Sequence, residues 1–323
     1  MRDNFNRQID YLRLSITDRC NLRCRYCMPA QGVPLKAQNE ILRLEELVTL
    51  AQAALKAGIR KIRLTGGEPL VRRNVVSLVR SLHALTGLEE ISLTTNGILL
   101  PALATPLKEA GLVRVNVSLD TLKPERYAYI TRGGNLHEVW RGLRAALAAG
   151  LEPVKVNVVV MRGFNEDEIL DFARLAVEQP LHVRFIEVMP IGMAAAARLD
   201  YVPVAEIRAR VEAFYPLQPA PGVKGNGPAV NFTFRDGRGS IGFIGAMSEH
   251  FCPRCNRLRL TADGRLRPCL YGDEEIDLRG PLRRGASLEE LVALFRQGIL
   301  CKPQRHHLES EGRRQGLMSQ IGG

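Results

Sequence analysis

The stretch Cys20-Asn21-Leu22-Arg23-Cys24-Arg25-Tyr26-Cys27 decides the fold of this chain. It places three thiols at C-x3-C-x2-C spacing directly after a short apolar strand. A structural zinc site closes with four ligands, whereas three cysteines on a cubane iron–sulfur cluster leave one iron free for another ligand. We therefore interpret the stretch as a loop that wraps one such cluster. Chance thiols or half of a zinc site are the alternatives.

This spacing resembles the signature of the radical S-adenosylmethionine (SAM) family. In that family the open iron chelates the amino and carboxylate groups of SAM. The resemblance implies a [4Fe-4S] cluster on Cys20, Cys24 and Cys27, which gives these cysteines a catalytic role. Tyr26 matches the aromatic position beside the adenine of SAM.

Length and composition limit the class of protein. The chain has 323 residues, of which 46% are hydrophobic, enough for one large α/β domain or two ordinary ones. No segment is long enough to span a membrane, and the polar residues up to Asp10 contain no signal-peptide stretch, so we expect a cytoplasmic protein. The seven cysteines divide into two sets of three and a leftover Cys301, which we expect to be buried.

The formal charge of +11, from 45 basic and 34 acidic residues, indicates an anionic partner. Nucleic acid, a membrane surface and a phosphorylated small molecule all fit that charge. Aromatic residues make up only 6% of the chain and do not alternate with basic ones, so nucleic acid is the weaker option.

Strand and helix patterns alternate over the first two-thirds of the chain, as in a parallel sheet with crossover helices. Six strands keep one polar face, although an ordinary buried parallel strand is apolar on both. A curled sheet explains this, because helices would cover its apolar side while Arg13, Arg63, Lys155 and Arg184 converge inside. We predict an incomplete (βα)6 TIM-like barrel; solvent-exposed strand faces are the alternative.

Polar motifs follow several of these strands. Thr65-Gly66-Gly67-Glu68-Pro69 ends the second strand, where α/β folds bind ligands. Alone it is typical of a tight turn. Downstream of the three-cysteine loop it resembles the Gly-Gly-Glu-Pro motif that holds the SAM amino group. Thr94–Gly97, Ser118–Asp120 and Met189-Pro190 occupy the matching ends of later strands.

After Tyr215 the sequence becomes rich in proline and glycine, so we predict a partial barrel over 1–215 and a C-terminal region over 216–323. Two hairpins are expected there, turning at Asp236-Gly237 and at Asp263-Gly264. The second hairpin brings Cys252, Cys255 and Cys269, spaced C-x2-C-x13-C, to a second three-thiol site. His250 could complete a zinc site instead, and the ligand types alone do not decide between zinc and iron–sulfur.

The segment from Cys252 to Cys269 resembles the C-terminal cluster region of the GTP 3',8-cyclases, which carry a second [4Fe-4S] cluster that contacts guanine. The resemblance extends from Arg13 to the terminal Gly322-Gly323. Positions that match SAM contacts are Tyr26, Gly66, Gly67, Glu68, Ser118 and Met189. Positions that match GTP contacts are Arg13, Arg63, Thr94, Lys155, Arg257, Leu258 and Arg259, with Gly322 and Gly323 of the tail. Met193–Arg198 departs from the more polar loop of the family.

The resemblance implies a lyase that begins molybdenum cofactor biosynthesis. A 5'-deoxyadenosyl radical from SAM removes the 3' hydrogen of GTP, and the ribose radical attacks C8 of guanine. Arg13 is a candidate to assist reduction of the cyclised radical. Expected partners are an electron donor such as flavodoxin or ferredoxin and a downstream cyclic pyranopterin monophosphate synthase, with a homodimer as a candidate assembly. The alternatives are a peptide-modifying radical SAM enzyme and a basic zinc protein that binds nucleic acid.

Overall fold

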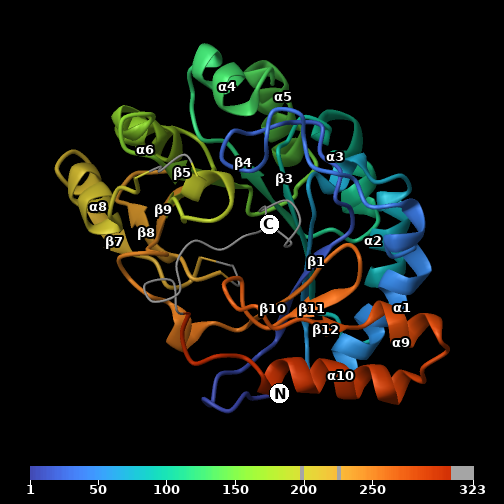
Figure 1. Cartoon of the computed structure of the whole chain (residues 1–323). Helices are drawn as coiled ribbons and strands as arrows, with labels where there is room; N and C mark the ends of the chain where they lie inside the picture. The colour runs from blue at the N-terminus through green and yellow to red at the C-terminus, as the bar shows by residue number, and fades with distance from the viewer. Residues whose placement is uncertain (197–199, 224–226, 307–323) are drawn as a thin grey trace.

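Strands and helices alternate along the first two-thirds of the chain in the computed structural model (Figure 1). The structure describes residues 1–196, 200–223 and 227–306. The alternating strands are β1 Tyr11–Ser15, β2 Lys61–Thr65, β3 Glu90–Thr95, β4 Arg114–Ser118, β5 Lys155–Val160 and β6 His182–Glu187. The helices of this part are α1 Leu44–Lys56, α2 Val75–His83, α3 Leu100–Glu109, α4 Pro124–Thr131, α5 Leu136–Ala148 and α6 Ile169–Glu178.

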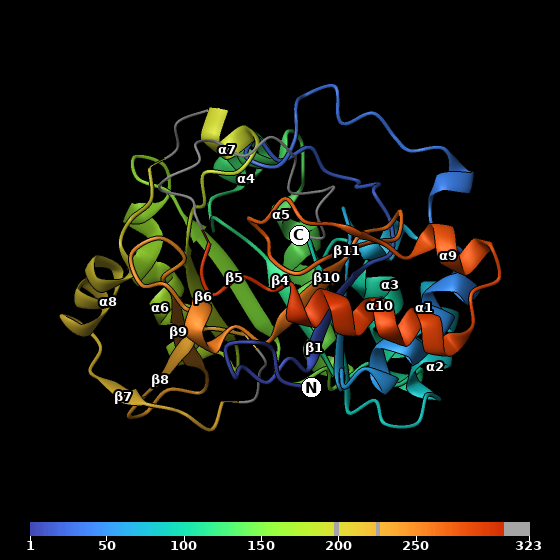
Figure 2. The ribbon, with the colours of Figure 1, turned by 60° about the horizontal axis from the view of Figure 1, so that its bottom comes forward.

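The helices lie on the outer, convex face of the curved sheet (Figures 1 and 2). α1 shows how the sequence produces this arrangement, because Leu47, Leu50 and Ala54 recur at helical spacing and are all buried. The helix stops at Lys56, and Gly58 follows with φ +108°, a left-handed conformation that favours glycine. The predicted helix over this stretch is confirmed.

A single twelve-stranded sheet runs through the described residues in the order β12-β11-β10-β1-β2-β3-β4-β5-β6-β9-β8-β7. β10 pairs parallel with β1, and β9 pairs parallel with β6, so the C-terminal region adds one parallel strand to each edge of the partial barrel. β8 and β11 pair antiparallel with these strands, which confirms both predicted hairpins. The six C-terminal strands are β7 Leu217–Pro219, β8 Val230–Phe234, β9 Ser240–Ile244, β10 Arg257–Leu260, β11 Arg265–Arg267 and β12 Ile276–Asp277.

Shorter elements complete the fold. The remaining α-helices are α7 Met193–Ala196, α8 Val204–Glu212, α9 Arg279–Arg283 and α10 Leu288–Leu300. The short 3-10 helices are η1 Gln38–Glu40, η2 Pro69–Val71, η3 Glu166–Glu168 and η4 Cys252–Arg254. α10 begins with a capping box between Ser287 and Glu290 and packs against α1 and β11.

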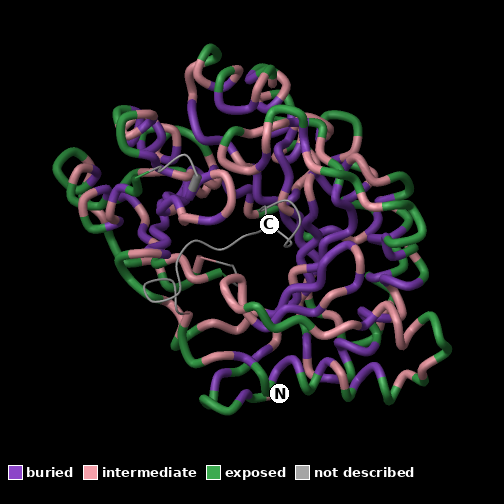
Figure 3. The backbone as a smooth tube through the Cα atoms, viewed as in Figure 1, coloured by how far each residue is buried: buried purple, intermediate pink, exposed green. Residues whose placement is uncertain are grey.

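The two faces of the sheet differ as the alternation predicts. Leu12 and Leu14 of β1 pack into the main hydrophobic core beneath the helices, whereas Arg13 lines the inner cavity. The parallel register places Arg13 opposite Arg63 of β2 and Arg259 of β10. Arg63 is only 4% exposed, so the alternative of solvent-exposed strand faces is wrong. Figure 3 shows the same division, with buried backbone in the sheet and exposed backbone on the outer turns.

The expectation that Cys301 is buried is wrong. Cys301 is exposed and follows the last turn of α10. Phe295 and Ile299 are buried on the side of that helix that faces the core. Cys301 comes two positions after Ile299, which places it on the opposite side. No helix within the described ranges is both long and apolar enough to cross a bilayer.

Phe185 of β6 joins the parallel sheet to its outer layer. Its fully buried ring packs edge-on against Phe172 of α6, with ring centroids 6.3 Å apart, and stacks on Phe243 of β9, with centroids 6.2 Å apart. We expect Phe185→Ala to lower the free energy of unfolding by about 3–5 kcal/mol, because it leaves a cavity in a packed core. Urea unfolding followed by circular dichroism measures this. Phe214→Ala is the control, since Phe214 is 68% exposed and its loss should cost no more than about 0.5 kcal/mol. Equal losses would contradict the prediction.

Candidate active site

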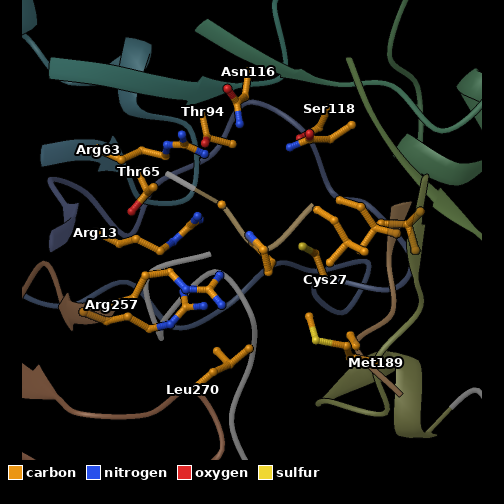
Figure 4. A pocket seen from close by; sticks show the side chains of 18 of the residues that line it. Arg13, Cys27, Arg63, Thr65, Thr94, Asn116, Ser118, Met189, Arg257 and Leu270 are labelled. Carbon is orange, nitrogen blue, oxygen red and sulfur yellow. The ribbon is translucent and has the colours of Figure 1, made fainter. Parts of the chain in front are cut away.

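One cavity on the inner face of the sheet collects most of the polar motifs. Its volume is about 340 Å³, within the range of small-molecule sites. Residues from β1 to β6 line it together with β10 and the segments around the C-terminal cysteines. Figure 4 shows Arg13, Arg63, Thr94 and Asn116 on one side of it and Cys27 and Met189 on another. Both three-cysteine sets reach this cavity.

The first cysteine loop follows β1 and is held by the end of α4. Backbone amides of Arg23 and Arg25 donate to the carbonyls of Thr131 and Ile130, at 3.2 and 2.8 Å. The Arg132 guanidinium donates to the carbonyls of Arg23 and Met28, at 2.7 and 2.8 Å. Sequence reasoning missed Arg132, because nothing near it in the chain marks its partner. These contacts fix the loop before any cofactor enters.

The three thiols of this loop lie near enough to influence one another's charge. Burial raises the pKa of Cys27 to about 12, and the neighbouring Cys20 adds to the rise. Burial followed by the charge of Cys27 raises the pKa of Cys24 as well. Three thiolates in so small a space need a positively charged group, and a bound metal deprotonates its thiol ligands. This donor set therefore fits an iron–sulfur cluster with one iron open.

The two glycines of the Gly-Gly-Glu-Pro stretch admit the backbone of the cysteine loop. A Cβ on Gly67 would lie 2.3 Å from the Arg19 carbonyl oxygen, and one on Gly66 would lie 2.5 Å from that of Thr17. The backbone amide of Gly67 donates to the Thr17 carbonyl at 3.0 Å, and that of Glu68 donates to the Arg19 carbonyl at 2.8 Å. The motif thus positions the start of the first cysteine loop as well as lining the cavity.

Glu68 presents a buried carboxylate to the cavity. Burial raises its pKa to about 7, although hydrogen bonds from Asn96, Thr95 and Leu70 oppose the shift. The Asn96 amide donates to Oε2 at 2.6 Å, while the Thr95 hydroxyl and the Leu70 amide donate to Oε1 at 2.7 and 3.0 Å. A carboxylate offers about four acceptor sites, so one is left for a ligand donor such as an ammonium group.

Tyr26 lies beside Asp120 at the carboxyl end of β4. Its hydroxyl donates to Asp120 Oδ2 at 2.7 Å, and Oδ1 of the same carboxylate accepts from the Val159 amide at 2.9 Å. Burial raises the pKa of Asp120 to about 6. The hydrogen bond between Tyr26 and Asp120 therefore ties the aromatic ring of the cysteine loop to the carboxyl end of β4.

The second three-cysteine set lies where the β10–β11 hairpin meets η4. Burial raises the pKa of Cys252, and the charges of Cys255 and Cys269 add to this rise. Burial raises the pKa of Cys255, but the charges of Arg257 and Lys302 outweigh it and bring the pKa down to about 6. His250 packs its ring edge-on against His306. Among the described residues, no three His, Cys, Asp or Glu side chains are grouped so as to hold one metal ion. All three cysteines of this set line the cavity.

A row of buried cations separates the two thiol sets. Burial and neighbouring cations lower the pKa of Arg13 and of Arg184 to about 9, and that of Lys155 to about 5. Arg63 Nη2 and Arg184 Nε are buried without a hydrogen-bond partner in the structure, and so are polar atoms of Thr94, Asn116 and Asn157. Unpaired buried groups of this kind cost about 1–3 kcal/mol each, so the cavity fits a polar, anionic ligand.

Most of the predicted site residues lie together in this cavity. Those that line it are Arg13, Cys20, Cys24, Tyr26, Cys27, Arg63, Gly66, Gly67, Glu68, Thr94, Ser118, Met189, Cys252, Cys255, Arg257, Arg259 and Cys269. Lys155 and Leu258 are fully buried and do not line it. Gly322 and Gly323 lie outside the described residues, as does part of Met193–Arg198, of which Met193–Ala196 forms α7. Asn116, Asn157 and Lys302 line the cavity and were missed.

Two family models cover most of the chain. The Radical SAM superfamily matches residues 14–176, and Molybdenum Cofactor Synthesis C matches residues 181–308. The first match covers half of the chain and contains the first cysteine loop with its Gly-Gly-Glu-Pro partner. The chain therefore belongs to the radical SAM superfamily, the class that its fold and thiol loop define.

Full-length relatives narrow this class to one family. The GTP 3',8-cyclases of Moorella thermoacetica and Pelotomaculum thermopropionicum are 67% and 56% identical to this chain over 323 and 325 residues, and each match covers 100% of both proteins. The chain is a member of the GTP 3',8-cyclase family. The crystal structure of Streptococcus suis SuiB bound to the precursor peptide SuiA resembles it with a TM-score of 0.61. At 12% identity, over 91% of this chain and 67% of that chain, this likeness shows the fold alone.

The cysteines should differ in reactivity when no metal is bound. With a pKa of about 6, Cys255 is mostly thiolate at pH 7, whereas Cys27, with a pKa of about 12, is a thiol. We expect iodoacetamide to label Cys255 before Cys27, with a rate that is half-maximal near pH 6 and levels off above it. Peptide mass spectrometry of the anaerobic, metal-free chain measures this. Arg257→Met should move the levelling-off to higher pH; similar labelling rates of Cys255 and Cys27 at pH 7 would contradict the assignment.

Proposed function

We propose that this chain converts GTP to (8S)-3',8-cyclo-7,8-dihydroguanosine 5'-triphosphate, the first step of molybdenum cofactor biosynthesis. One observation carries the proposal: a single cavity joins two three-thiol sites across a row of buried cations. The first site suits radical generation, the second suits a nucleobase, and the cations suit phosphates. The relatives that match over their whole length bear the same activity in their names.

Cys20, Cys24 and Cys27 would hold the first [4Fe-4S] cluster, and SAM would lie beside it. Glu68 has an acceptor site for the SAM ammonium group, Gly66 and Gly67 would line the cavity beside it, and Ser118 and Met189 would line the adjoining wall. Tyr26, fixed by Asp120, would lie next to the adenine. When bound, the reduced cluster and SAM supply a 5'-deoxyadenosyl radical that removes the 3' hydrogen of GTP.

The residues between the two thiol sites would hold GTP. Arg13, Arg63 and Arg259 stand side by side on adjacent strands, and their guanidinium groups can bind phosphate oxygens in pairs. Thr94 adds an unpaired hydroxyl to this wall. Lys155 and Leu258 would support this wall from behind by packing, since Lys155, with a pKa of about 5, is neutral at pH 7.

Cys252, Cys255 and Cys269 would carry a second [4Fe-4S] cluster at the base-binding end, next to Arg257. The tail glycines Gly322 and Gly323 could approach the nucleotide without side-chain clashes.

This arrangement assigns the chain itself a positioning role. The buried cations fix the triphosphate, so the ribose is held relative to the first cysteine loop, and the closed inner face of the sheet excludes water from reactive intermediates. Arg13 lies in the middle of the cationic row and is the candidate to assist reduction of the cyclised product. With a pKa of about 9, Arg13 stays protonated at neutral pH. It can give up a proton only to an acceptor that enters the site.

The same reading implies partners. Electrons would come from a small carrier such as flavodoxin or ferredoxin, and the product would pass to cyclic pyranopterin monophosphate synthase in the cytoplasm. A homodimer is the candidate assembly, and neither nucleic acid nor a membrane is a proposed partner. A peptide-modifying radical SAM enzyme and a zinc protein that binds nucleic acid are the rival functions.

The decisive assay is anaerobic incubation of the reconstituted chain with SAM, dithionite and GTP, followed by mass spectrometry. We expect 5'-deoxyadenosine and cyclised GTP to form together, and only when GTP is present. Iron and inorganic sulfide should reach about eight each per chain, as two cubane clusters require. Deoxyadenosine without cyclised GTP would favour a different substrate, whereas zinc without sulfide would favour the nucleic-acid protein.

Single cysteine variants separate the two thiol sites. Cys24→Ala should abolish SAM cleavage, because radical generation needs the first cluster. Cys255→Ala should keep part of the SAM cleavage and lose cyclisation, because only placement of the base depends on the second cluster. Production of deoxyadenosine and of cyclised GTP is measured in parallel. Equal loss of both activities in the two variants would refute this division of roles.

A further inference from the structure

The segment Lys302–His306, called here the C-terminal strap, crosses the second three-cysteine site. It begins directly after α10, which lies so close to β11 that a Cβ on Gly298 would stand 2.6 Å from Leu266 Cδ2. Lys302 and His306 both line the cavity. The backbone amide of His306 donates a hydrogen bond to the Cys252 thiol. Both ends of the strap therefore contact the thiol site.

Lys302 joins the two arms of that site. Its ammonium group donates to the carbonyl oxygen of Arg257 at 2.8 Å and to that of Pro268 at 2.7 Å. Arg257 begins β10 two residues after Cys255, and Pro268 lies between the end of β11 and Cys269, so the two carbonyls belong to the two arms of the hairpin. Lys302 is only 3% exposed, so both hydrogen bonds are shielded from water and its charge is poorly screened.

Arg7, in the N-terminal segment, holds the strap through hydrogen bonds. Its guanidinium donates to the carbonyls of Cys252 at 2.9 Å, Pro303 at 2.7 Å and Gln304 at 3.0 Å. Asp3 orients it through a buried ion pair of 2.6 Å to Nε. The N-terminal segment and the strap, blue and red in Figure 1, thus lie side by side.

The charge of Lys302 acts on the thiol site itself. Burial lowers the pKa of Lys302, while the negative charges of Cys255 and Cys269 oppose that shift, so ammonium and thiolates stabilise one another. The potential of an iron–sulfur cluster depends on nearby charge and on hydrogen bonds to its sulfur atoms. A fixed buried cation here favours the reduced, more negative state of a bound cluster.

We propose that Lys302 is a positioning residue for the second cluster: it ties together the two thiol-bearing arms and raises the cluster's reduction potential, with Arg7 and Asp3 holding it in place. The proposal rests on the proposed function, since it requires a cluster at Cys252, Cys255 and Cys269. Lys302 would act through the carbonyl oxygens of Arg257 and Pro268, to which it donates.

The test uses the full chain with Cys24→Ala, so that only the second cluster is loaded. We expect Lys302→Met, which removes the charge but keeps a long side chain, to shift the midpoint potential of this cluster to a more negative value in an EPR-monitored redox titration. Iron loss to a chelator should become about tenfold faster, the usual effect of removing a group that supports metal ligands.

Matched variants isolate the effect. Lys56→Met removes an exposed lysine on α1 that pairs with Glu289 of α10, and it should change neither quantity. Lys302→Met combined with Cys255→Ala, which loads only the first cluster, should leave that cluster's potential unchanged. Arg7→Gln, which keeps Lys302 but frees the strap, should shift the potential of the second cluster in the same direction as Lys302→Met.

The outcomes separate this inference from the function on which it rests. Faster iron loss with an unchanged potential would mean a merely structural lysine and would overturn the proposal. If Lys302→Met assembles no second cluster, Arg7→Gln decides: a negative shift supports the proposal and an unchanged potential overturns it. If the Cys24→Ala chain with Lys302 intact takes up no iron and sulfide, the second cluster and the proposed function fail together.

Discussion

The concentration of positive charge on the inner face of the sheet is the constraint on which this structure depends. Arg13, Arg63 and Arg259 lie on three neighbouring strands in register, and Arg184 adds a fourth guanidinium from β6. Burial lowers the pKa of all four, and Arg259 adds to the shift of Arg13, Arg13 to that of Arg63, and Arg63 to that of Arg184. The apolar face beneath the helices must supply the stability that this face lacks. Such a row of buried cations lowers the stability of the folded chain and raises its affinity for an anion.

The local patterns were sufficient to predict the parts of the site that follow one another in the chain. The alternation of Leu12, Arg13 and Leu14 predicted both the strand and which of its faces is polar, because side-chain direction in a strand has period two. Turn residues at Asp263-Gly264 predicted the hairpin that brings Cys269 near Cys255. The same reasoning stopped at topology: nothing in β9 or β10 reveals that each pairs parallel with an edge of the barrel, since periodicity carries no information about partners.

Residues that act across long sequence separations were also out of reach. Arg132 holds the first cysteine loop from about a hundred positions away, and Arg7 holds a strap near the other end of the chain. An isolated arginine reads as a solvated surface charge until its carbonyl partners are known. The expectation for Cys301 failed for a different reason: it was placed in the core as the cysteine left over from the two thiol sets, whereas its position after α10 turns it outward.

The parallel pairing of β10 with β1 also fixes how far apart the two thiol sites are. Cys255 precedes β10 and Cys20 follows β1, so the two sites lie at opposite ends of adjacent strands. Five residues of β1 at about 3.3 Å each separate the two ends of the strand by roughly 16 Å. A small amino acid could not reach from one to the other, whereas an extended nucleotide could meet both. The backbone of the sheet therefore sets the separation between the two thiol sites, and a side-chain substitution that leaves the β1–β10 pairing intact does not change it.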